Sequence, residues 1–284
     1  MLISITTTCN MQCTHCMDDA NPYQLNEYHD NVMDYDFHEC PERYMRFDTF
    51  VHAFDTFMGI GGMECVITGG EPMENPLFWE FIKYAVNTIR ALNELKHVTV
   101  TTNGMHLFME DQTTCTNFKE LEKYESESDI LTFQITNDKR YYSLPYRENS
   151  NVFNKITGLD NVIFVDDIGD TLYPQGRAIK NYSNICTAKA PKCFNIRSAV
   201  RSLNDLKAAI NVLNLHGKFC TPQIACDGSI KLGESNLCPV CSNINKSMNE
   251  VISDIIDFKC SGCKMILDKM PDELLKAIGE NKDA

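Results

Sequence analysis

Three cysteines near the start of the chain stand close enough in sequence to share one metal centre. They follow the largely β-branched run ISITTT and are Cys9, Cys13 and Cys16. Thiolates are ligands of zinc and of iron–sulfur clusters. A structural zinc site normally closes with four protein ligands, and no fourth Cys or His stands at suitable spacing, since the ring of the intervening His15 would tend to point away. Three thiolates on a [4Fe–4S] cluster would leave one iron open for chemistry.

The elements that must position these cysteines are short apolar strands alternating with helical stretches. We expect the strands within residues 1–8, 64–72, 96–104, 130–138 and 161–169. We expect the helices over residues 46–60, 75–92, 117–126 and 202–217. The helix over 75–92 is expected to have Asn75 as its N-cap and Pro76 at its first position.

This alternation indicates parallel strands joined by crossover helices, as in an α/β barrel or part of one. Active sites of such folds lie at the carboxyl ends of the strands. Informative residues follow four expected strands in turn, namely Cys9, Gly69 to Pro72, Asn103 with Gly104, and Thr136 to Asp138.

The spacing Cys-x3-Cys-x2-Cys, with the aromatic His15 before the third cysteine, resembles the signature of radical S-adenosylmethionine (SAM) enzymes. The segment ITGGEP, residues 67–72, looks like that family's Gly-Gly-Glu-Pro strand end. The resemblance implies a partial (β/α)6 TIM-like barrel whose cluster binds SAM through the open iron. It also implies reductive cleavage of SAM to a 5′-deoxyadenosyl radical that abstracts hydrogen from a substrate.

The same resemblance implies which side chains face the cofactor. The glycines of GGEP would let backbone carbonyls approach the amino group of SAM without an intervening Cβ, and Glu71 would add an acceptor or order the loop. Arg140 and Arg177 are alternatives for pairing with the methionine carboxylate. The expected cofactor-binding residues are His15, Gly69, Gly70, Glu71, Pro72, Asn103, Thr136 and Asn137.

A second group of cysteines lies near the C-terminus, and two interpretations of it stay open. The pairs Cys238/Cys241 and Cys260/Cys263 have the spacing of a zinc ribbon. The alternative is a twitch domain, the shortened SPASM extension of radical SAM enzymes, which it resembles through Cys-x12-Gly-x4-Cys followed by Cys-x2-Cys. That resemblance implies an auxiliary [4Fe–4S] cluster on Cys220, Cys238, Cys260 and Cys263.

On the twitch interpretation Cys226 and Cys241 are spare, and the roles of Cys186 and Cys193 stay open. We therefore expect a radical SAM core over residues 1–215 and a small C-terminal iron–sulfur domain over 216–284. Because the first strand begins at residue 3, we expect no N-terminal domain that binds a leader peptide.

Composition limits the classes of partner that the chain is expected to bind. The chain has 284 residues and a net charge of −13, which argues against a general nucleic-acid binder. No stretch has about 18 uncharged apolar residues. Fourteen cysteines without a secretion signal favour metal or redox chemistry and a cytoplasmic location. We expect an electron donor such as flavodoxin or ferredoxin, no nucleic acid and no membrane.

These features predict an oxidoreductase or maturase that modifies a peptide or protein side chain oxidatively. Dehydrogenation of a small molecule, such as a sugar or an aminoglycoside-like alcohol, is the main alternative. A glycyl-radical activating enzyme and a non-catalytic iron–sulfur redox sensor are minor ones.

Overall fold

The computed structural model describes residues 1–16, 20, 43–60, 63–108, 112–137, 151–165, 181, 222–232 and 239–258. Its strands are β1 (Leu2–Ser4), β2 (Glu64–Thr68), β3 (His97–Thr102), β4 (Leu131–Thr136), β5 (Val162–Val165), β6 (Pro222–Ile224), β7 (Ser229–Leu232) and β8 (Val240–Asn243). Its helices are α1 (Phe47–Ile60), α2 (Phe78–Leu92), α3 (Met105–Phe108), α4 (Gln112–Lys123), α5 (Asn151–Ile156) and α9 (Met248–Asp257), with short 3-10 turns η3 (Pro72–Glu74) and η4 (Glu125–Glu127).

All eight of these strands form one sheet, in the order β5-β4-β3-β2-β1-β6-β7-β8. Strands β1 to β5 are parallel, as crossover connections require, whereas β7 pairs antiparallel with β6 and with β8. This confirms a mixed α/β fold with a mostly parallel sheet. The partial barrel and the helix over 202–217 involve residues outside the described ranges and stay predictions.

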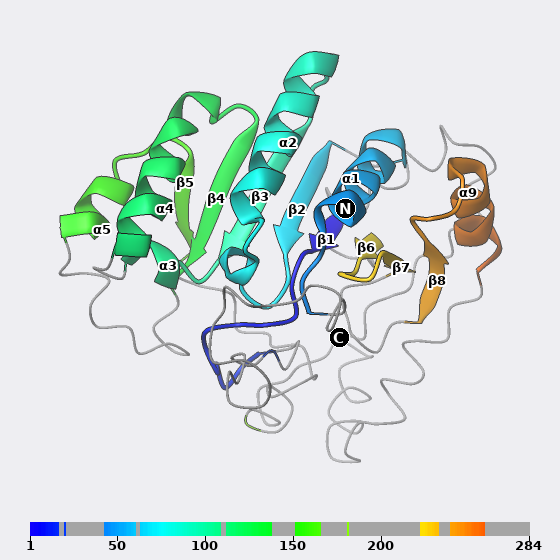
Figure 1. Ribbon diagram of the computed structural model, residues 1–284, viewed down its shortest axis with the longest axis horizontal. Helices are drawn as coiled ribbons and strands as arrows, with labels where there is room; N and C mark the ends of the chain where they lie inside the picture. Colours follow the sequence, from blue (N-terminus) through cyan, green and yellow to red (C-terminus); the bar gives the residue numbers. More distant parts are fainter. Residues whose placement is uncertain are drawn as a thin grey trace, which may run out of the picture.

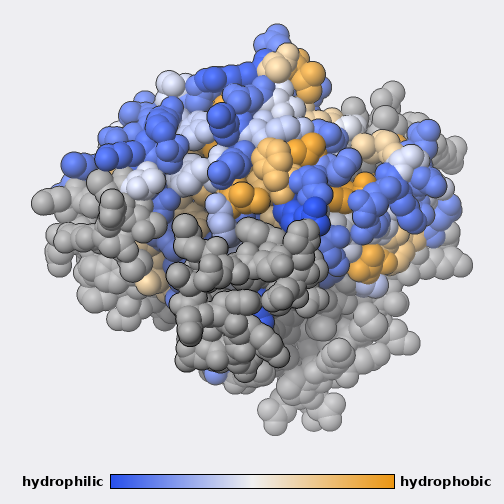
Figure 2. Space-filling view, viewed as in Figure 1, coloured by the Kyte–Doolittle hydropathy of each residue, from blue (hydrophilic) through white to orange (hydrophobic). Residues whose placement is uncertain are grey.

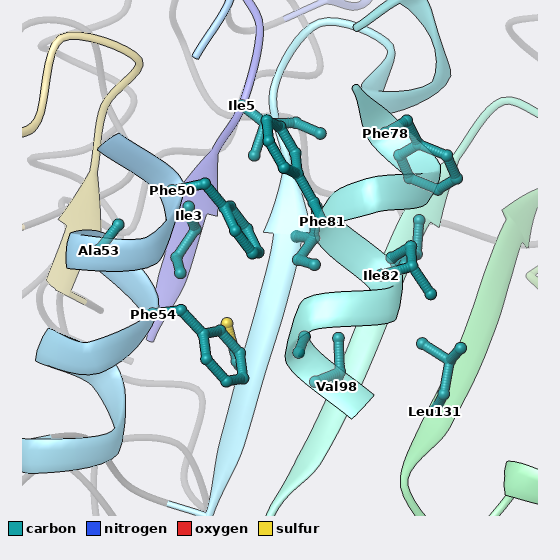
Figure 3. Close-up of a cluster of buried hydrophobic side chains, with 14 of the residues drawn as sticks. Ile3, Ile5, Phe50, Ala53, Phe54, Phe78, Phe81, Ile82, Val98 and Leu131 are labelled. Carbon is teal, nitrogen blue, oxygen red and sulfur yellow. The ribbon is translucent and has the colours of Figure 1, made fainter. Parts of the chain in front are cut away.

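The main core lies between the sheet and helices α1 and α2 (Figure 3). Apolar residues recur at helical spacing along both helices, so each helix turns one face towards the strands. The rings of Phe50 and Phe81 stack with centroids 4.3 Å apart and join the two helices above Ile3 of β1. The outward surface of α4 and much of that of α2 is hydrophilic (Figure 2).

The strands near the C-terminus, β6, β7 and β8, continue the same sheet on the far side of β1 from β2. Leu2 pairs with Gln223, and side chains such as Ile224, Ile230 and Val251 belong to the one buried cluster that also contains the core of α1 and α2. Helix α9 packs against α1 beside β8 (Figure 1). The described residues after 216 therefore contribute to the same buried cluster as the first half. The expected division into residues 1–215 and 216–284 stays a prediction, because most of the second part lies outside the described ranges.

The start of α2 differs from the expected start. The helix begins at Phe78, two residues later than an N-cap at Asn75 implies, although the Asn75 side chain still accepts a hydrogen bond from the Leu77 backbone N–H at 2.9 Å. Its amide nitrogen donates to the carbonyl oxygens of Ile5 at 2.8 Å and Met45 at 3.1 Å. Asn75 is only 1% exposed. It thus ties the end of β1 to the start of α1 and of α2.

Asn75→Ala should lower the free energy of unfolding by about 2–4 kcal/mol, because two buried carbonyl oxygens and one N–H lose their partner. Urea unfolding followed by circular dichroism measures the change. The exposed Asn245 provides a matched control, and Asn245→Ala should change the free energy by less than about 0.5 kcal/mol. Similar small effects for both variants would contradict the linking role of Asn75.

Within the described residues, no helix combines the length and the apolar character needed to span a membrane.

Candidate cluster and cofactor site

The residues that the sequence places after β1 and β2 meet at one edge of the sheet. Figure 1 shows the segment after β1 leaving the sheet at the edge towards which the arrowheads of β2 and β4 point. The backbone N–H of Gly70 donates to the Thr6 carbonyl oxygen at 2.9 Å, and the N–H of Glu71 donates to that of Thr8 at 2.7 Å. The GGEP segment is therefore hydrogen-bonded to the residues immediately before Cys9.

The two glycines are required by this backbone contact. A Cβ added to Gly69 would lie 2.2 Å from the Thr6 carbonyl oxygen, and one added to Gly70 would lie 2.0 Å from that of Thr8. Gly69 also has a φ of 137°, which L side chains rarely adopt. Both residues must be glycine for the strand ends to touch. This reason differs from the one expected from the sequence, which concerned the approach of a carbonyl to the cofactor.

Glu71 lies beneath this contact and is 1% exposed. Its carboxylate accepts hydrogen bonds from the Thr102 hydroxyl at 2.6 Å, from the Asn103 backbone N–H at 2.8 Å and from the Met73 N–H at 3.2 Å. Burial raises the pKa of the Glu71 carboxyl above its ordinary value, and these three donors partly offset the rise. Of the two expected roles, the geometry supports ordering of the loop.

A second side-chain bridge joins the segments that follow β2 and β3. The His106 Nε2 lies 2.6 Å from a carboxylate oxygen of Glu74, and both side chains are partly buried. When protonated, the same imidazole lowers the pKa of Glu71, so it opposes the effect of burial. Two acidic side chains of the GGEP region thus fix the start of the loop after β3.

The side chain of Asn103 continues this network into the cysteine loop. Its amide nitrogen donates to the Asn10 Oδ1 at 2.8 Å and lies 3.7 Å from the Cys9 sulfur. The Met11 backbone N–H also points to the Cys9 sulfur, at 3.4 Å. Sequence reasoning singled out Asn103 but missed Asn10 and Thr102, because neither residue type is distinctive until the strands bring them together.

The three cysteines occupy one loop but differ in exposure. Cys9 is 8% exposed, whereas Cys13 and Cys16 are partly exposed and are joined by a turn in which the Cys16 N–H donates to the Cys13 carbonyl oxygen at 3.2 Å. The pKa of the Cys9 thiol is raised to about 12, chiefly by burial and to a smaller extent by the negative charges of Glu71, Cys13 and Cys16, while the Met11 N–H opposes the rise. Three thiolates would therefore repel one another here unless a cation joined them.

The three thiols of this loop are the candidate ligands of the predicted cluster. Among the described residues, no group of three His, Cys, Asp or Glu side chains is found that could hold a single metal ion. In a [4Fe–4S] cluster each of the three thiolates would bind a different iron. Two N–H groups directed at the Cys9 sulfur would also stabilise it as a thiolate ligand. Cys9, Cys13 and Cys16 would thus hold the cluster that the sequence predicts.

The remaining predicted residues are distributed as follows. Pro72 is buried at the start of η3, and His15 is partly exposed in the cysteine loop. Thr136 and Asn137 lie at the end of β4, two strands from β2, where the Asn137 N–H donates to the Val165 carbonyl oxygen at 2.8 Å. Several predicted or considered residues lie outside the described ranges: Arg140, Arg177, Cys186, Cys193, Cys220, Cys238, Cys260 and Cys263.

The two cysteines expected to be spare act as buried or half-buried thiol donors. The Cys226 sulfur donates to the Ser4 carbonyl oxygen at 3.1 Å, and burial raises its pKa to about 12. The Cys241 sulfur donates to the Ile230 carbonyl oxygen at 3.2 Å. Both thiols therefore have a backbone carbonyl as a hydrogen-bond partner, and the choice between the zinc ribbon and the twitch domain stays open.

Glu71→Gln should lower the free energy of unfolding by about 1–3 kcal/mol, because its amide N–H2 would face a backbone N–H donor. Urea unfolding at several pH values measures it. Because the folded-state pKa is raised, the carboxyl stabilises the fold fully below its unfolded pKa of about 4.3. That contribution is lost as pH rises through the folded-state pKa. The difference in the free energy of unfolding between the wild type and Glu71→Gln should therefore become smaller at higher pH.

Glu122, an exposed residue of α4, supplies the control. Glu122→Gln should show no such pH-dependent difference. If the difference in the free energy of unfolding between the wild type and Glu71→Gln instead grew as pH rises, Glu71 would be held as a carboxylate, contrary to the expected raised pKa.

Comparison with known proteins finds similarity within the first half of the chain. Residues 3–135 match the family model described as the Radical SAM superfamily. Two curated relatives are GTP 3′,8-cyclases, from Actinobacillus succinogenes at 32% identity and from Pectobacterium atrosepticum at 30%, each over 105 residues or 37% of this chain. The match spans only 26% and 27% of those relatives, about a quarter of their length.

Comparison with solved structures finds a weak likeness to two peptide-bound proteins. One is described as native anSMEcpe with bound AdoMet and Cp18Cys peptide, with a TM-score of 0.46, 13% identity, and coverage of 89% of this chain and 79% of that one. The other is Streptococcus suis SuiB bound to precursor peptide SuiA, also at 0.46 and 13%, covering 93% and 69%. At these values neither likeness bears on the reaction.

The matched stretch contains the cysteine loop, the GGEP segment and Asn103, which the structure joins at one edge of the sheet. Residues 3–135, just under half of the chain, are thus similar to the radical SAM superfamily at the positions that form this site.

Proposed function

We propose that the chain is a radical SAM oxidoreductase or maturase that modifies a peptide or protein side chain oxidatively. The observation that carries the proposal is the attachment of the cysteine loop to the GGEP segment through Gly70, Glu71 and Asn103, within the stretch that matches the family. Dehydrogenation of a small molecule is the alternative. Because the GTP 3′,8-cyclases are matched over a quarter of their length, their reaction is not transferred to this chain.

The chain's own residues supply binding and order. Cys9, Cys13 and Cys16 would hold the cluster, and the strand ends at GGEP and Asn103 would form the wall against which SAM binds. When bound, these groups supply one-electron cleavage of SAM to methionine and a 5′-deoxyadenosyl radical that takes a hydrogen atom from the substrate. The buried Glu71 network would keep this wall in place.

We further propose an auxiliary [4Fe–4S] cluster, in a twitch-like region, on Cys220, Cys238, Cys260 and Cys263. The hydrogen-bonded thiols of Cys226 and Cys241 support this ligand set, since they leave those four as the candidates within the C-terminal region. Four thiolates would fully ligate the cluster, which favours electron transfer over substrate binding. Such a cluster would supply a one-electron acceptor, which a net oxidation of the substrate requires. Zinc at this position is the alternative.

The proposed partners are a peptide, protein or small-molecule substrate and a low-potential electron donor such as flavodoxin or ferredoxin. The net charge of −13 supports a substrate other than nucleic acid. The chain has fourteen cysteines, and six of those in the described residues form no disulfide bond, which supports a reducing compartment such as the cytoplasm.

Under anaerobic reduction, the wild-type protein should cleave SAM to 5′-deoxyadenosine and methionine, and Cys13→Ala should reduce cleavage to background. Chromatography of 5′-deoxyadenosine measures the reaction. Cys241→Ala should keep the wild-type rate, because this residue lies outside the cysteine loop and its thiol donates to the Ile230 carbonyl oxygen. Equal cleavage by wild type and Cys13→Ala would exclude the proposed cluster site.

The triple variant Cys9→Ala, Cys13→Ala, Cys16→Ala should retain about four irons with matching sulfide and no zinc. The retained metal would belong to the auxiliary cluster, because the first set of ligands is gone. Metal and sulfide analysis of anaerobically purified protein tests this. One zinc with negligible iron would instead establish a structural zinc site and remove the proposed electron acceptor.

A further inference from the structure

The amide of Asn103 is held in one orientation, with its nitrogen towards Cys9. Its Oδ1 accepts the Met105 backbone N–H at 2.8 Å, and its own backbone N–H donates to Glu71 at 2.8 Å. Because a backbone N–H can only donate, the atom facing Met105 must be the oxygen. The Nδ2 therefore faces Asn10 and the sulfur of Cys9.

Asn10 holds that nitrogen in place. Its Oδ1 accepts from Asn103 at 2.8 Å, and no hydrogen-bond partner of its own Nδ2 is found among the described residues, although this atom is buried. The Cys9 sulfur thus has two N–H groups beside it, from Met11 at 3.4 Å and from Asn103 at 3.7 Å. It is also the sulfur of the most buried of the three cysteines. Exclusion of water strengthens the effect of both dipoles.

We propose that Asn103 is a positioning residue that raises the reduction potential of the cluster held through Cys9. Reduction adds one electron, and so one negative charge, to a cluster and its thiolates. An N–H group directed at a ligand sulfur stabilises the reduced state more than the oxidised state. Asn103 would therefore make it easier for the electron donor to reduce the cluster. This inference rests on the proposed function, because it requires a cluster at Cys9, Cys13 and Cys16.

Asn103→Ser is the cleanest test. A serine hydroxyl can still accept the Met105 N–H, and the backbone N–H to Glu71 is kept, but the amide donor that residue 103 places beside Cys9 is lost while the Met11 N–H remains. The midpoint potential, titrated by electron paramagnetic resonance on the signal that the triple cysteine variant lacks, should fall. We expect about a tenfold smaller equilibrium constant for reduction, which is ~59 mV for one electron. Asn103→Asp should lower it further, because it adds a negative charge.

Asn10→Ala and Asn245→Ala complete the set. Asn10→Ala frees the Asn103 amide without touching its bonds to Met105 and Glu71, so a smaller fall is expected. Asn245→Ala, at an exposed residue after β8, should leave the potential unchanged. Iron and sulfide content and urea unfolding show whether each variant is loaded and folded.

The outcomes separate the two proposals. If the wild type holds the cluster and Asn103→Ser has the same midpoint potential, the tuning role alone is overturned. If Asn103→Ser and Asn10→Ala both fold but take up no cluster, Asn103 serves assembly of the loop, and the tuning role is again overturned. If the wild type has no signal that the triple cysteine variant lacks, the proposed function fails and this inference fails with it.

Discussion

A buried carboxyl with three hydrogen-bond donors holds the functional edge of this molecule together. Glu71 sits at the end of β2 and accepts from Met73 in its own segment and from Thr102 and Asn103 of the neighbouring strand. An unpaired carboxyl at this depth would be strongly unfavourable, so the loop after β3 must supply its donors. The position of Asn103, and hence its contact with the cysteine loop, depends on this requirement.

The close contact between β1 and β2 adds a second constraint on the same edge. The strand ends approach so closely that Gly69 and Gly70 cannot carry a Cβ. As a result the backbone just before Cys9 is hydrogen-bonded to the GGEP segment instead of following a free loop. Both constraints act on backbone and buried groups, which are the parts of a protein that move least. A rigid edge of this kind suits a reaction whose reactive groups must be held close together.

The C-terminal strands show how the chain uses cysteine for two different purposes. The Cys226 thiol donates a hydrogen bond to the Ser4 carbonyl oxygen of β1, which helps to join the strands near the C-terminus to the first strand. Cys241 does the same within the antiparallel pair β7 and β8. These thiols behave as small side chains of the core, whereas those of the cysteine loop would repel one another once ionised unless a cation joined them. Cysteine count alone therefore overstates the number of candidate ligands.

The sequence by itself determined the strand order in the chain, the apolar helix faces and the two motifs at Cys9–Cys16 and 67–72, because local periodicity and spacing are encoded over a few residues. It also predicted Glu71 and Asn103 as site residues, although with less definite roles. Tertiary structure alone decided that β6 pairs with β1, that Asn75 joins three segments, and that Asn10 and Thr102 take part in the site. Such contacts join residues 30 to more than 200 positions apart, and their partners are common residue types. Only the packing of the sheet brings them within hydrogen-bonding distance.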